Sequence, residues 1–394
     1  MASSIVRLQA QRHKRAQGGH PWVYSNEIVT DDPTVKSAEA GMIVEFRTHD
    51  KQFIGRGTFN PKTLIAGRIF TRKPIELIDG DFIRARLSDA LALRERLLAE
   101  PFYRLIHAEA DGLPGLIVDR FGSHLSLQVN TAGMEKLTSL VIETLMSLVK
   151  PESIVLRNDS SARALEGLTR EITLAHGTLN GPIEIRENGL IYYADPQGGQ
   201  KTGWYFDQRD NRALVARYAK DKTVLDLYCN AGGFALAAAK AGASKVLAVD
   251  SSESALELAQ KSATKNKIKS CAFHRADVFE DLERRIKASE KYDIVVADPP
   301  AFVKSRKDIT SGSRGYRKLA KLAAGVTAYQ GLLFMASCSY NMALADFVEQ
   351  VAKGSFEARR QARVLHTVFA APDHPVQPHL PESAYLKGVL VRLD

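Results

Sequence analysis

Residues 222–250 constrain the fold more strongly than any other part of the chain, because two short apolar runs flank a segment of small residues. The runs Val224–Leu227 and Lys245–Val249 have the length and composition of buried strands. Between them, a glycine turn at Gly232 leads into the alanine-rich segment 235–241, which favours a helix. The stretch therefore predicts a parallel strand–helix–strand unit whose ligand crevice lies at the carboxyl ends of its strands.

Four predicted strands each end at an acidic residue: Asp226, Asp250, Asp277 and Asp298. Because the carboxyl ends of parallel strands meet at one edge of a sheet, we expect the four carboxylates to lie along one crevice. The turn after the first strand lacks the G-x-G-x-x-G pattern of dinucleotide sites, since Tyr228 and Asn230 stand where the first two glycines would be. This disfavours an NAD-dependent dehydrogenase and leaves a nucleoside-sized ligand.

The strand-end acids and the glycine turn together resemble those of the class I S-adenosylmethionine (SAM) methyltransferases. The resemblance implies that Asp226 and Gly232 hold the methionine end of SAM. It also implies that Asp250 holds the ribose and that Asp277 meets the adenine. SAM is therefore the expected cofactor, and no metal site is expected. The neighbouring residues assigned to the same cofactor site are Asn230, Ser251, Val278 and Asp298.

Length and composition limit the class of protein. A chain of 394 residues is long enough for two or three domains. It has no apolar run of about 18 residues, so no membrane-spanning helix is expected. The cysteines Cys229, Cys271 and Cys338 show neither metal-ligand spacing nor a disulfide framework, which fits a reducing compartment. The first fifteen residues are rich in arginine and lack acids, as in a transit peptide, but the alternation of polar and apolar residues in Ile5–Leu8 is typical of a domain's first strand, so a cytoplasmic protein is favoured.

The N-terminal residues 1–76 predict a small β-barrel, because short β-like segments alternate with glycine and proline turns. Within them, Gly18–Ile28 (GGHPWVYSNEI) resembles the opening of PUA domains, a fold found attached to RNA-modifying enzymes. The net charge of +9 favours a polyanionic partner such as RNA. The nearby basic cluster is expected to contact RNA phosphates, the alternative being a solvated face. The residues assigned to this contact are Arg12, Lys14 and Arg15.

The rest of the chain completes an α/β protein. Residues 77–182 alternate helical and strand patterns and predict a central α/β domain. Residues 183–203 are typical of a hairpin or linker. Residues 204–394 are expected to form a Rossmann-like, class I SAM methyltransferase domain. The predicted architecture is thus an N-terminal PUA-like β-barrel, a central α/β insert domain and a C-terminal doubly wound domain.

A cysteine follows the fifth core strand of the last domain, where the apolar run 332–336 leads into Ser337-Cys338-Ser339. In a doubly wound sheet the ends of the fourth and fifth strands are neighbours, so Asp298 and Cys338 should face one cleft beside the SAM methyl group. A thiolate that adds to carbon 6 of a pyrimidine makes carbon 5 nucleophilic, while Asp298 polarises the base at N3 and its exocyclic amine. The alternative is that Cys338 is only a small buried apolar residue.

Distinct short segments follow one another along the chain: HPWVYS, ADGLPGLIVDRF (Ala110–Phe121), GQKTGWYFDQR, DLYCNAGGF, DPPAF and SCS. Their sequence and order resemble those of the RlmI-type large-subunit rRNA cytosine-5 methyltransferases, over essentially the whole chain. The resemblance implies methylation of carbon 5 of a cytosine in 23S rRNA, with Cys338 as the nucleophile. Many cytosine-5 RNA methyltransferases carry a second cysteine where this chain has Ala301, which leaves the product-release step open.

The basic stretch 304–321 lies between the motifs DPPAF and SCS. It is expected to be a flexible loop that orders over RNA. A helix is expected to follow from about Arg317. The target base is expected to leave its stack, because attack at carbon 6 needs access to the ring face. The residues assigned to RNA contact here are Phe302, Lys304, Arg306, Arg314 and Tyr316.

Two other functions remain open at this point. In an amino-group RNA methyltransferase, the motif from Asp298 to Phe302 would bind an exocyclic amine and stack on the base, and no thiol would be needed. A catalytically inactive, RNA-binding ribosome-assembly factor would keep the fold without transferring a methyl group. The oligomeric state is open as well, with a homodimer as one alternative.

Overall fold

A computed structural model describes residues 4–199 and 202–394 of the chain. Gln200 and Lys201, which belong to the predicted linker, lie outside the described residues. The fold divides into two compact units, and neither is one continuous segment. Unit 1 comprises Met1–Gly181, Pro196–Gly203 and Asp373–Ser383, and unit 2 comprises Pro182–Asp195, Trp204–Pro372 and Ala384–Asp394.

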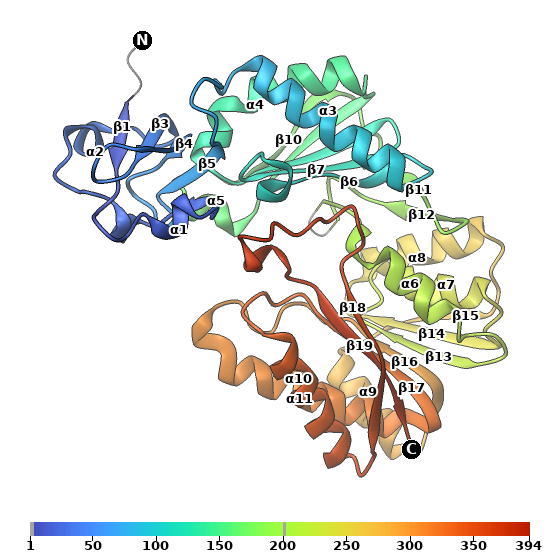
Figure 1. Cartoon of the computed structure of the whole chain (residues 1–394). Helices are drawn as coiled ribbons and strands as arrows, with labels where there is room; N and C mark the ends of the chain where they lie inside the picture. The colour runs from blue at the N-terminus through green and yellow to red at the C-terminus, as the bar shows by residue number, and fades with distance from the viewer. Residues whose placement is uncertain (1–3, 200–201) are drawn as a thin grey trace. The chain divides into compact units, whose positions relative to one another are not determined.

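The N-terminal part of unit 1 is a five-stranded sheet with the order β1-β3-β4-β5-β2 (Figure 1). Only β1 and β3 pair in parallel, and the other strand pairs of this sheet are antiparallel. Gly57 lies where β4 and β5 approach so closely that a Cβ would strike the carbonyl of Arg68, which is why glycine stands there. The elements are β1 (Ile5–Arg7), α1 (Lys14–Gln17), β2 (Trp22–Val23), α2 (Pro33–Ser37), β3 (Met42–Arg47), β4 (Phe53–Phe59) and β5 (Gly67–Thr71).

The rest of unit 1 is a second five-stranded sheet with the order β10-β9-β8-β7-β6, on which helices α3 and α4 pack. Both helices begin at a capping side chain, since Asp79 accepts the N–H of Phe82 and Thr131 accepts the N–H of Met134. The elements are α3 (Gly80–Leu97), β6 (Phe102–His107), β7 (Leu116–Phe121), β8 (His124–Val129), α4 (Ala132–Leu148), β9 (Ser153–Asn158), α5 (Ser161–Leu165) and β10 (Glu171–Gly177).

A late segment of the chain, Asp373–Ser383, packs into unit 1 through buried polar groups. Arg94 of α3 forms a buried ion pair with Asp111 at 2.6 Å, and its Nη2 also donates to the carbonyl of Asp373 at 3.0 Å. The carboxylate of Asp373 accepts the backbone N–H of Arg104 at 3.0 Å. Unit 1 is therefore completed by residues far along the sequence.

Unit 2 contains a seven-stranded sheet with the order β15-β14-β13-β16-β17-β19-β18. The first five strands in this order are parallel, and β19 and β18 complete the sheet in antiparallel pairs. The chain order reverses between β13 and β16, so the carboxyl ends of these strands form the switch point of a doubly wound sheet. The strands are β13 (Thr223–Leu227), β14 (Lys245–Asp250), β15 (Cys271–Arg275), β16 (Tyr292–Ala297), β17 (Thr327–Ser337), β18 (Ala362–Phe369) and β19 (Lys387–Leu393).

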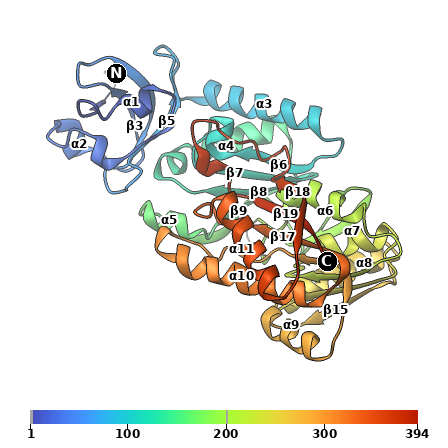
Figure 2. The same ribbon diagram turned by 60° about the horizontal axis from the view of Figure 1, so that its bottom comes forward.

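Helices cover both faces of this sheet (Figures 1 and 2). One core cluster joins the sheet to α9, α10 and α11 through residues such as Leu282, Leu319 and Phe347. The other joins it to α6, α7 and α8 through residues such as Val215 and Phe234. The helices are α6 (Arg209–Ala216), α7 (Gly233–Lys240), α8 (Glu253–Lys265), α9 (Val278–Lys287), α10 (Ile309–Val326) and α11 (Leu344–Glu357).

The predicted hairpin is present as β11 (Ile183–Glu187) and β12 (Leu190–Ala194), and it belongs to unit 2. Its second strand bonds to the end of α8, where Ser262 Oγ accepts the N–H of Tyr193 and Asn266 Oδ1 accepts that of Ile191. The hairpin is thus part of the fold that contains the seven-stranded sheet.

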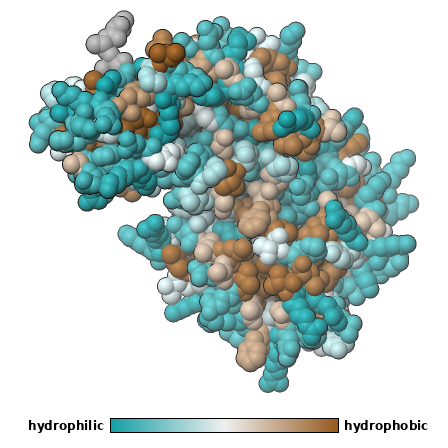
Figure 3. Space-filling model, viewed as in Figure 1, coloured by the Kyte–Doolittle hydropathy of each residue, from teal (hydrophilic) through white to brown (hydrophobic). Residues whose placement is uncertain are grey.

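Apolar side chains stay exposed along the outer strand β18. Val364, Leu365 and Phe369 are 48%, 46% and 54% exposed, and Figure 3 shows apolar residues gathered over this part of the sheet.

Among the described helices, none is long and apolar enough to cross a bilayer.

Candidate active site

The glycine turn after β13 brings a buried carboxylate to the switch point. Asp226 is 1% exposed, and its Oδ2 accepts the N–H of Ala235 at 2.8 Å. Its Oδ1 is buried and has no hydrogen-bond partner among the described residues. Burial raises the pKa of this carboxyl to about 8, and the charges of Asp298 and Asp250 add to the effect. Gly232 (φ +81°) is the N-cap of α7 in a left-handed conformation, and a Cβ there would lie 3.0 Å from the Cβ of Ala259, so glycine is favoured at this turn.

The second strand-end acid is held by backbone donors. Asp250 Oδ2 accepts the N–H of Asn230 and Oδ1 accepts that of Ser252, both at 2.9 Å. Asn230 has a φ of 48°, in the left-handed region that asparagine tolerates, so the turn carries its N–H to the end of β14. Ser251 is exposed next to this carboxylate. Both carboxylate oxygens keep lone pairs that can accept further hydroxyl donors.

Asp277 follows β15 and caps α9. Its Oδ1 accepts the N–H groups of Phe279 and Glu280 at 2.9 and 3.1 Å, and the side chain is exposed. Val278, the first residue of α9, is buried beside it. The three acids thus stand at the carboxyl ends of three neighbouring strands, as expected for a site that binds a nucleoside.

These residues fit SAM in this structure. The unpaired Oδ1 of Asp226 suits the ammonium group of the methionine end, because a buried carboxylate is stabilised by a cationic donor. Asp250 can accept the ribose hydroxyls through its remaining lone pairs. The fit rests on side chains of unit 2 alone.

The fourth acid, Asp298, is oriented by a chain of amides. Gln208 Nε2 donates to Asp298 Oδ2 at 2.9 Å, and Asn211 Nδ2 donates to Gln208 Oε1 at 2.6 Å. Asn211 also donates to the carbonyl of Phe369 at 3.1 Å. Gln208, at 2% exposure, lies in η3 (Phe206–Gln208), just before α6. Gln208 and Asn211 lie three residues apart at the start of a helix. This spacing is the sequence signal from which their side-chain contact could have been predicted.

Cys338 follows β17 and is half-buried against the sheet. The hydroxyls on either side of it are buried: Ser337 Oγ donates to Tyr316 Oη at 2.8 Å, and Ser339 Oγ lies 2.9 Å from the same phenol. Ser339 Oγ also accepts the N–H of Val303 at 3.1 Å, which ties the end of β17 to the loop after β16. The loop that carries Asp298 and the loop that carries Cys338 are therefore bonded together.

Tyr205 is a site residue that the sequence did not single out. Burial raises the pKa of its phenol, and the charges of Asp298, Asp207 and Cys338 raise it further. The phenol of Tyr205 therefore stays protonated at ordinary pH.

The other two cysteines, Cys229 and Cys271, lie where burial disfavours a thiolate. Cys229 is buried, and burial raises the pKa of its thiol well above the ordinary value. Burial raises the pKa of Cys271 to about 12. Both thiols therefore stay protonated at neutral pH, which makes them poor nucleophiles.

Two predictions for the stretch 304–321 are wrong. The helix α10 begins at Ile309, not at about Arg317, and its glycines lie inside the helix. Gly312 lets α10 pack on the loop after β16, since a Cβ there would lie 2.7 Å from the carbonyl oxygen of Phe302. Tyr316 is 0% exposed within the core, so it does not contact RNA. Its place on the apolar face of α10 explains both its burial and its bonds to the serines.

The other predicted RNA contacts differ in exposure. Arg15 is engaged within unit 1, because its Nη2 lies 2.9 Å from Glu27 Oε2 and its guanidinium stacks 4.2 Å from the ring of Tyr24, so the prediction that it contacts phosphate is not supported. Phe302 is half-buried with its ring 4.8 Å from that of Tyr316. The exposed members of the set are Arg12, Lys14, Lys304, Arg306 and Arg314.

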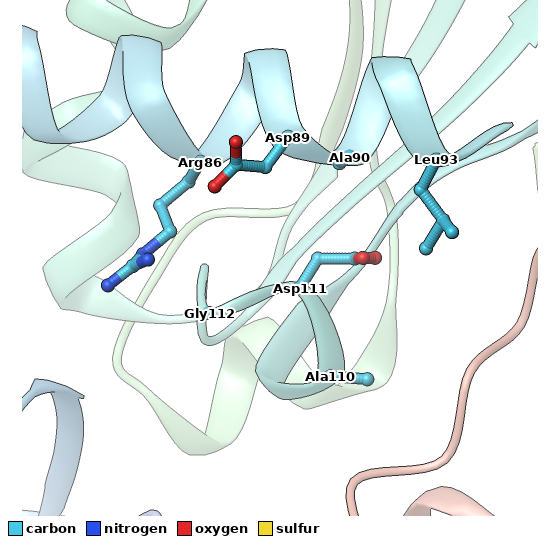
Figure 4. Close-up of a pocket in the computed structure, with 7 residues that line it drawn as sticks. All are labelled: Arg86, Asp89, Ala90, Leu93, Ala110, Asp111 and Gly112. Atoms are coloured by element: carbon cyan, nitrogen blue, oxygen red, sulfur yellow. The ribbon is translucent and has the colours of Figure 1, made fainter. Parts of the chain in front are cut away.

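A cavity of about 280 Å³ lies in unit 1, between α3 and the turn η2 (Ala108–Asp111) (Figure 4). Its charged lining groups include Arg86 and Asp111, and Asp111 is already paired with Arg94. None of the lining residues carries a thiol, hydroxyl or imidazole. The lining residues are Arg86, Asp89, Ala90, Leu93, Ala110, Asp111 and Gly112.

Two family models match the chain. One for a PUA-like domain matches residues 6–72, and one for S-adenosylmethionine-dependent methyltransferases matches residues 170–392. The first match covers all but the first residue of the N-terminal sheet, and the second covers all but the last residue of the seven-stranded sheet.

Curated relatives match over nearly their full length. A ribosomal RNA large subunit methyltransferase I from Tolumonas auensis is 38% identical over 99% of this chain and 99% of its own. A protein of the same name from Shewanella frigidimarina is 36% identical over 98% and 99%.

Solved structures share the fold over the same length. SMU.776, described as a methyltransferase and solved in complex with SAH, superposes with a TM-score of 0.85 at 19% identity, covering 98% of this chain and 99% of its own. A SAM-dependent methyltransferase from Streptococcus mutans gives a TM-score of 0.83 at 19% identity, with coverage of 98% and 99%.

Proposed function

Because the chain belongs to the S-adenosylmethionine-dependent methyltransferases of large-subunit ribosomal RNA, we propose that it methylates carbon 5 of a cytosine in 23S rRNA, with Cys338 as the nucleophile. The chain is thus a SAM-dependent rRNA methyltransferase, and what is proposed is the atom that it methylates and how that atom is activated. The observation that carries the proposal is that Asp298 and Cys338 directly follow the paired parallel strands β16 and β17, whose end loops are joined by the hydrogen bond from the N–H of Val303 to Ser339 Oγ.

The proposed reaction uses the thiol because carbon 5 of cytosine is a poor nucleophile. The thiolate of Cys338 adds to carbon 6, forming an S–C6 bond and moving the π electrons of the C5–C6 bond to carbon 5. Carbon 5 then takes the methyl group that SAM supplies. Loss of the carbon-5 proton to water and cleavage of the S–C6 bond restore the ring and the thiolate.

Asp298 is proposed to polarise the base during the addition. Its Oδ2 is held by Gln208, which fixes the carboxyl relative to the loop after β16. A carboxyl positioned in this way can bond to N3 and the exocyclic amine, where charge builds as the thiolate adds. Cys338 and Asp298 would then act from the ends of the adjacent strands β17 and β16.

The cofactor roles follow the fit described for unit 2. Asp226 is proposed to receive the ammonium group, with Gly232 leaving room for the methionine end. Asp250 is proposed to bind the ribose hydroxyls and Asp277 the adenine. The residues that would line the same site beside them are Asn230, Ser251, Val278 and Asp298.

The exposed basic residues are proposed to bind the RNA backbone. Lys304, Arg306 and Arg314 surround the loop after β16 and the first turns of α10. Arg12 and Lys14 lie at α1 of the PUA-like part. Neutralising phosphates with such residues releases counterions and makes binding dependent on salt.

The test is methyl transfer by Cys338→Ala, with Cys271→Ala as the matched control. Purified protein, labelled SAM and 23S rRNA from a strain lacking the enzyme are combined, and the modified nucleoside is identified by mass spectrometry. We expect 5-methylcytidine with the wild type and with Cys271→Ala, and none with Cys338→Ala. RNA containing 5-fluorocytidine should remain covalently attached to the wild type, because fluorine at carbon 5 is not lost as the proton is.

Methylation at an exocyclic amine is the competing outcome. Transfer that survives Cys338→Ala, with the product methylated on nitrogen, would replace the carbon-5 mechanism by amino-group chemistry at the motif from Asp298 to Phe302. Binding of SAM without any transfer to rRNA would instead support an inactive assembly factor.

A further inference from the structure

A buried lysine holds the turn that follows Cys338. Lys387 is the first residue of β19 and pairs with Ser337 of β17 in the strand register. Its side chain is 4% exposed, and Nζ donates to the carbonyl of Ser339 at 2.6 Å and to that of Met342 at 2.7 Å. The same carbonyl of Ser339 also accepts the N–H of Met342 at 3.1 Å. The ammonium group therefore closes the turn from Ser339 to Met342.

We propose that Lys387 is a positioning residue for the nucleophile, whose ammonium group fixes this turn and stabilises the Cys338 thiolate. This inference rests on the proposed role of Cys338. It adds a residue from the C-terminal strand, far from the motifs of the SAM and base sites in the sequence.

The hydrogen-bond partners of Lys387 do not neutralise its positive charge. Its two bonds go to neutral carbonyl oxygens, and among the described residues it forms no ion pair. Burial lowers the pKa of Lys387 to about 8, while negative charge on Cys338 raises it. The influence is reciprocal, so the ammonium lowers the pKa at which Cys338 ionises. A buried cation without a counterion is costly, and a thiolate at position 338 offsets that cost.

The other groups that face Cys338 do not supply this charge. Tyr205 and Tyr316 act electrostatically on Cys338, but burial raises the pKa of both phenols, so they stay neutral at ordinary pH. Asp298, on the neighbouring strand end, is acidic and disfavours a thiolate. Lys387 is thus a group beside Cys338 whose positive charge favours ionisation.

The test is the alkylation rate of Cys338 by iodoacetamide, followed at that residue by peptide mass spectrometry from pH 6 to pH 10. In Lys387→Met, which keeps an unbranched side chain one atom shorter and removes the charge, we expect alkylation at pH 7 to slow about tenfold, because fewer thiols are ionised. The matched control is Lys291→Met, since Lys291 also donates to a backbone carbonyl, that of Gly325. The control should alkylate at the wild-type rate.

A second measurement avoids any loss of folding in the Lys387 variant. The titration of Lys387 is followed by carbon-13 NMR in the wild type and in Cys338→Ala. Removal of the thiolate should lower the pKa of Lys387. Identical titration in the two proteins, or an unchanged alkylation profile in a folded Lys387→Met protein, would overturn the inference. Neither readout requires methyl transfer, so a failure of the carbon-5 mechanism would be seen separately, as activity of Cys338→Ala.

Discussion

Gln208 Nε2 lies 2.9 Å from Asp298 Oδ2 and donates a hydrogen bond to it across 90 positions of sequence. The amide of Gln208 is itself fixed by Asn211, so the orientation of the carboxyl depends on the start of α6. Removal of this contact should affect the reacting base more than the cofactor.

We expect Gln208→Ala to slow methyl transfer about ten- to a hundredfold, because a buried hydrogen bond to a charged group contributes roughly 1.5–3 kcal/mol. SAM affinity should change little. Single-turnover rates and calorimetry separate the two effects. Gln260→Ala on the exposed face of α8 is the control. An equal loss of SAM affinity and rate would assign Gln208 to the cofactor site instead.

SAM binding should release a proton at neutral pH. Burial raises the pKa of Asp226 to about 8, so this carboxyl is mostly protonated at pH 7 without a ligand. An ammonium donor at Oδ1 favours the ionised form and expels the proton. Calorimetry in two buffers with different heats of ionisation measures the proton released. Asp226→Asn should abolish this buffer dependence, and its persistence would point to another group.

The raised pKa of Asp226 also predicts how the free energy of unfolding depends on pH. Its folded pKa is raised from the usual 3.8, so the folded state binds a proton that the unfolded chain has released. The free energy of unfolding should therefore fall as the pH rises from about 4 to about 8 and then level off. Thermal unfolding of the SAM-free protein measures this slope, and Asp226→Asn should flatten it.

Gly312→Ala should destabilise unit 2 by about 1–3 kcal/mol, because the added methyl group would be forced against the backbone of Phe302. Gly325→Ala in the same helix is the control, since its methyl group would meet only the flexible end of Ile286 at 3.0 Å. The urea midpoint is read from Trp204 fluorescence in a Trp22→Phe background. A midpoint for Gly312→Ala at or above that of the control would show that the loop can move aside.

Arg94→Met should weaken unit 1 by roughly 3–5 kcal/mol, because it leaves the carboxylate of Asp111 buried without its partner. Hydrogen exchange of the amides in β6 and β7 measures the loss. Arg84→Met is the control, since Arg84 lies on the exposed face of the same helix. Equal exchange in both variants would mean that the ion pair adds no net stability.

Sequence patterns predicted the parts of the site that depend on local order. Asp226, Asp250, Asp277 and Asp298 lie at or next to the ends of parallel strands as predicted, because the end of a strand is visible in the sequence, while their roles toward SAM and the base stay predictions. Tyr316 was wrongly predicted to contact RNA, because that prediction also used only the neighbouring residues in the sequence. The glycines and serines around it indicated a loop, whereas Gly312 and Gly315 lie inside α10 and let it pack closely on the loop after β16.

The residues that sequence reasoning missed act over long separations. Lys387 reaches a turn 45 and 48 positions earlier in the chain, and no local pattern marks it. In the sequence, Tyr205 stands among aromatic and charged residues, and no local pattern distinguishes it from these neighbours. Contacts of this kind follow from how strands are ordered in the sheet, which a single sequence does not reveal.

Asp373 has a consequence for the order of events during synthesis. Its carboxylate and carbonyl satisfy Arg104 and Arg94 in unit 1, yet it is made after nearly all of unit 2. While a nascent chain emerges from the ribosome, Arg94 and Arg104 lack this partner until Asp373 has been made. Unit 1 can therefore reach its finished packing only after most of unit 2 has been synthesised, and a shortened product ending before Asp373 would leave it incomplete.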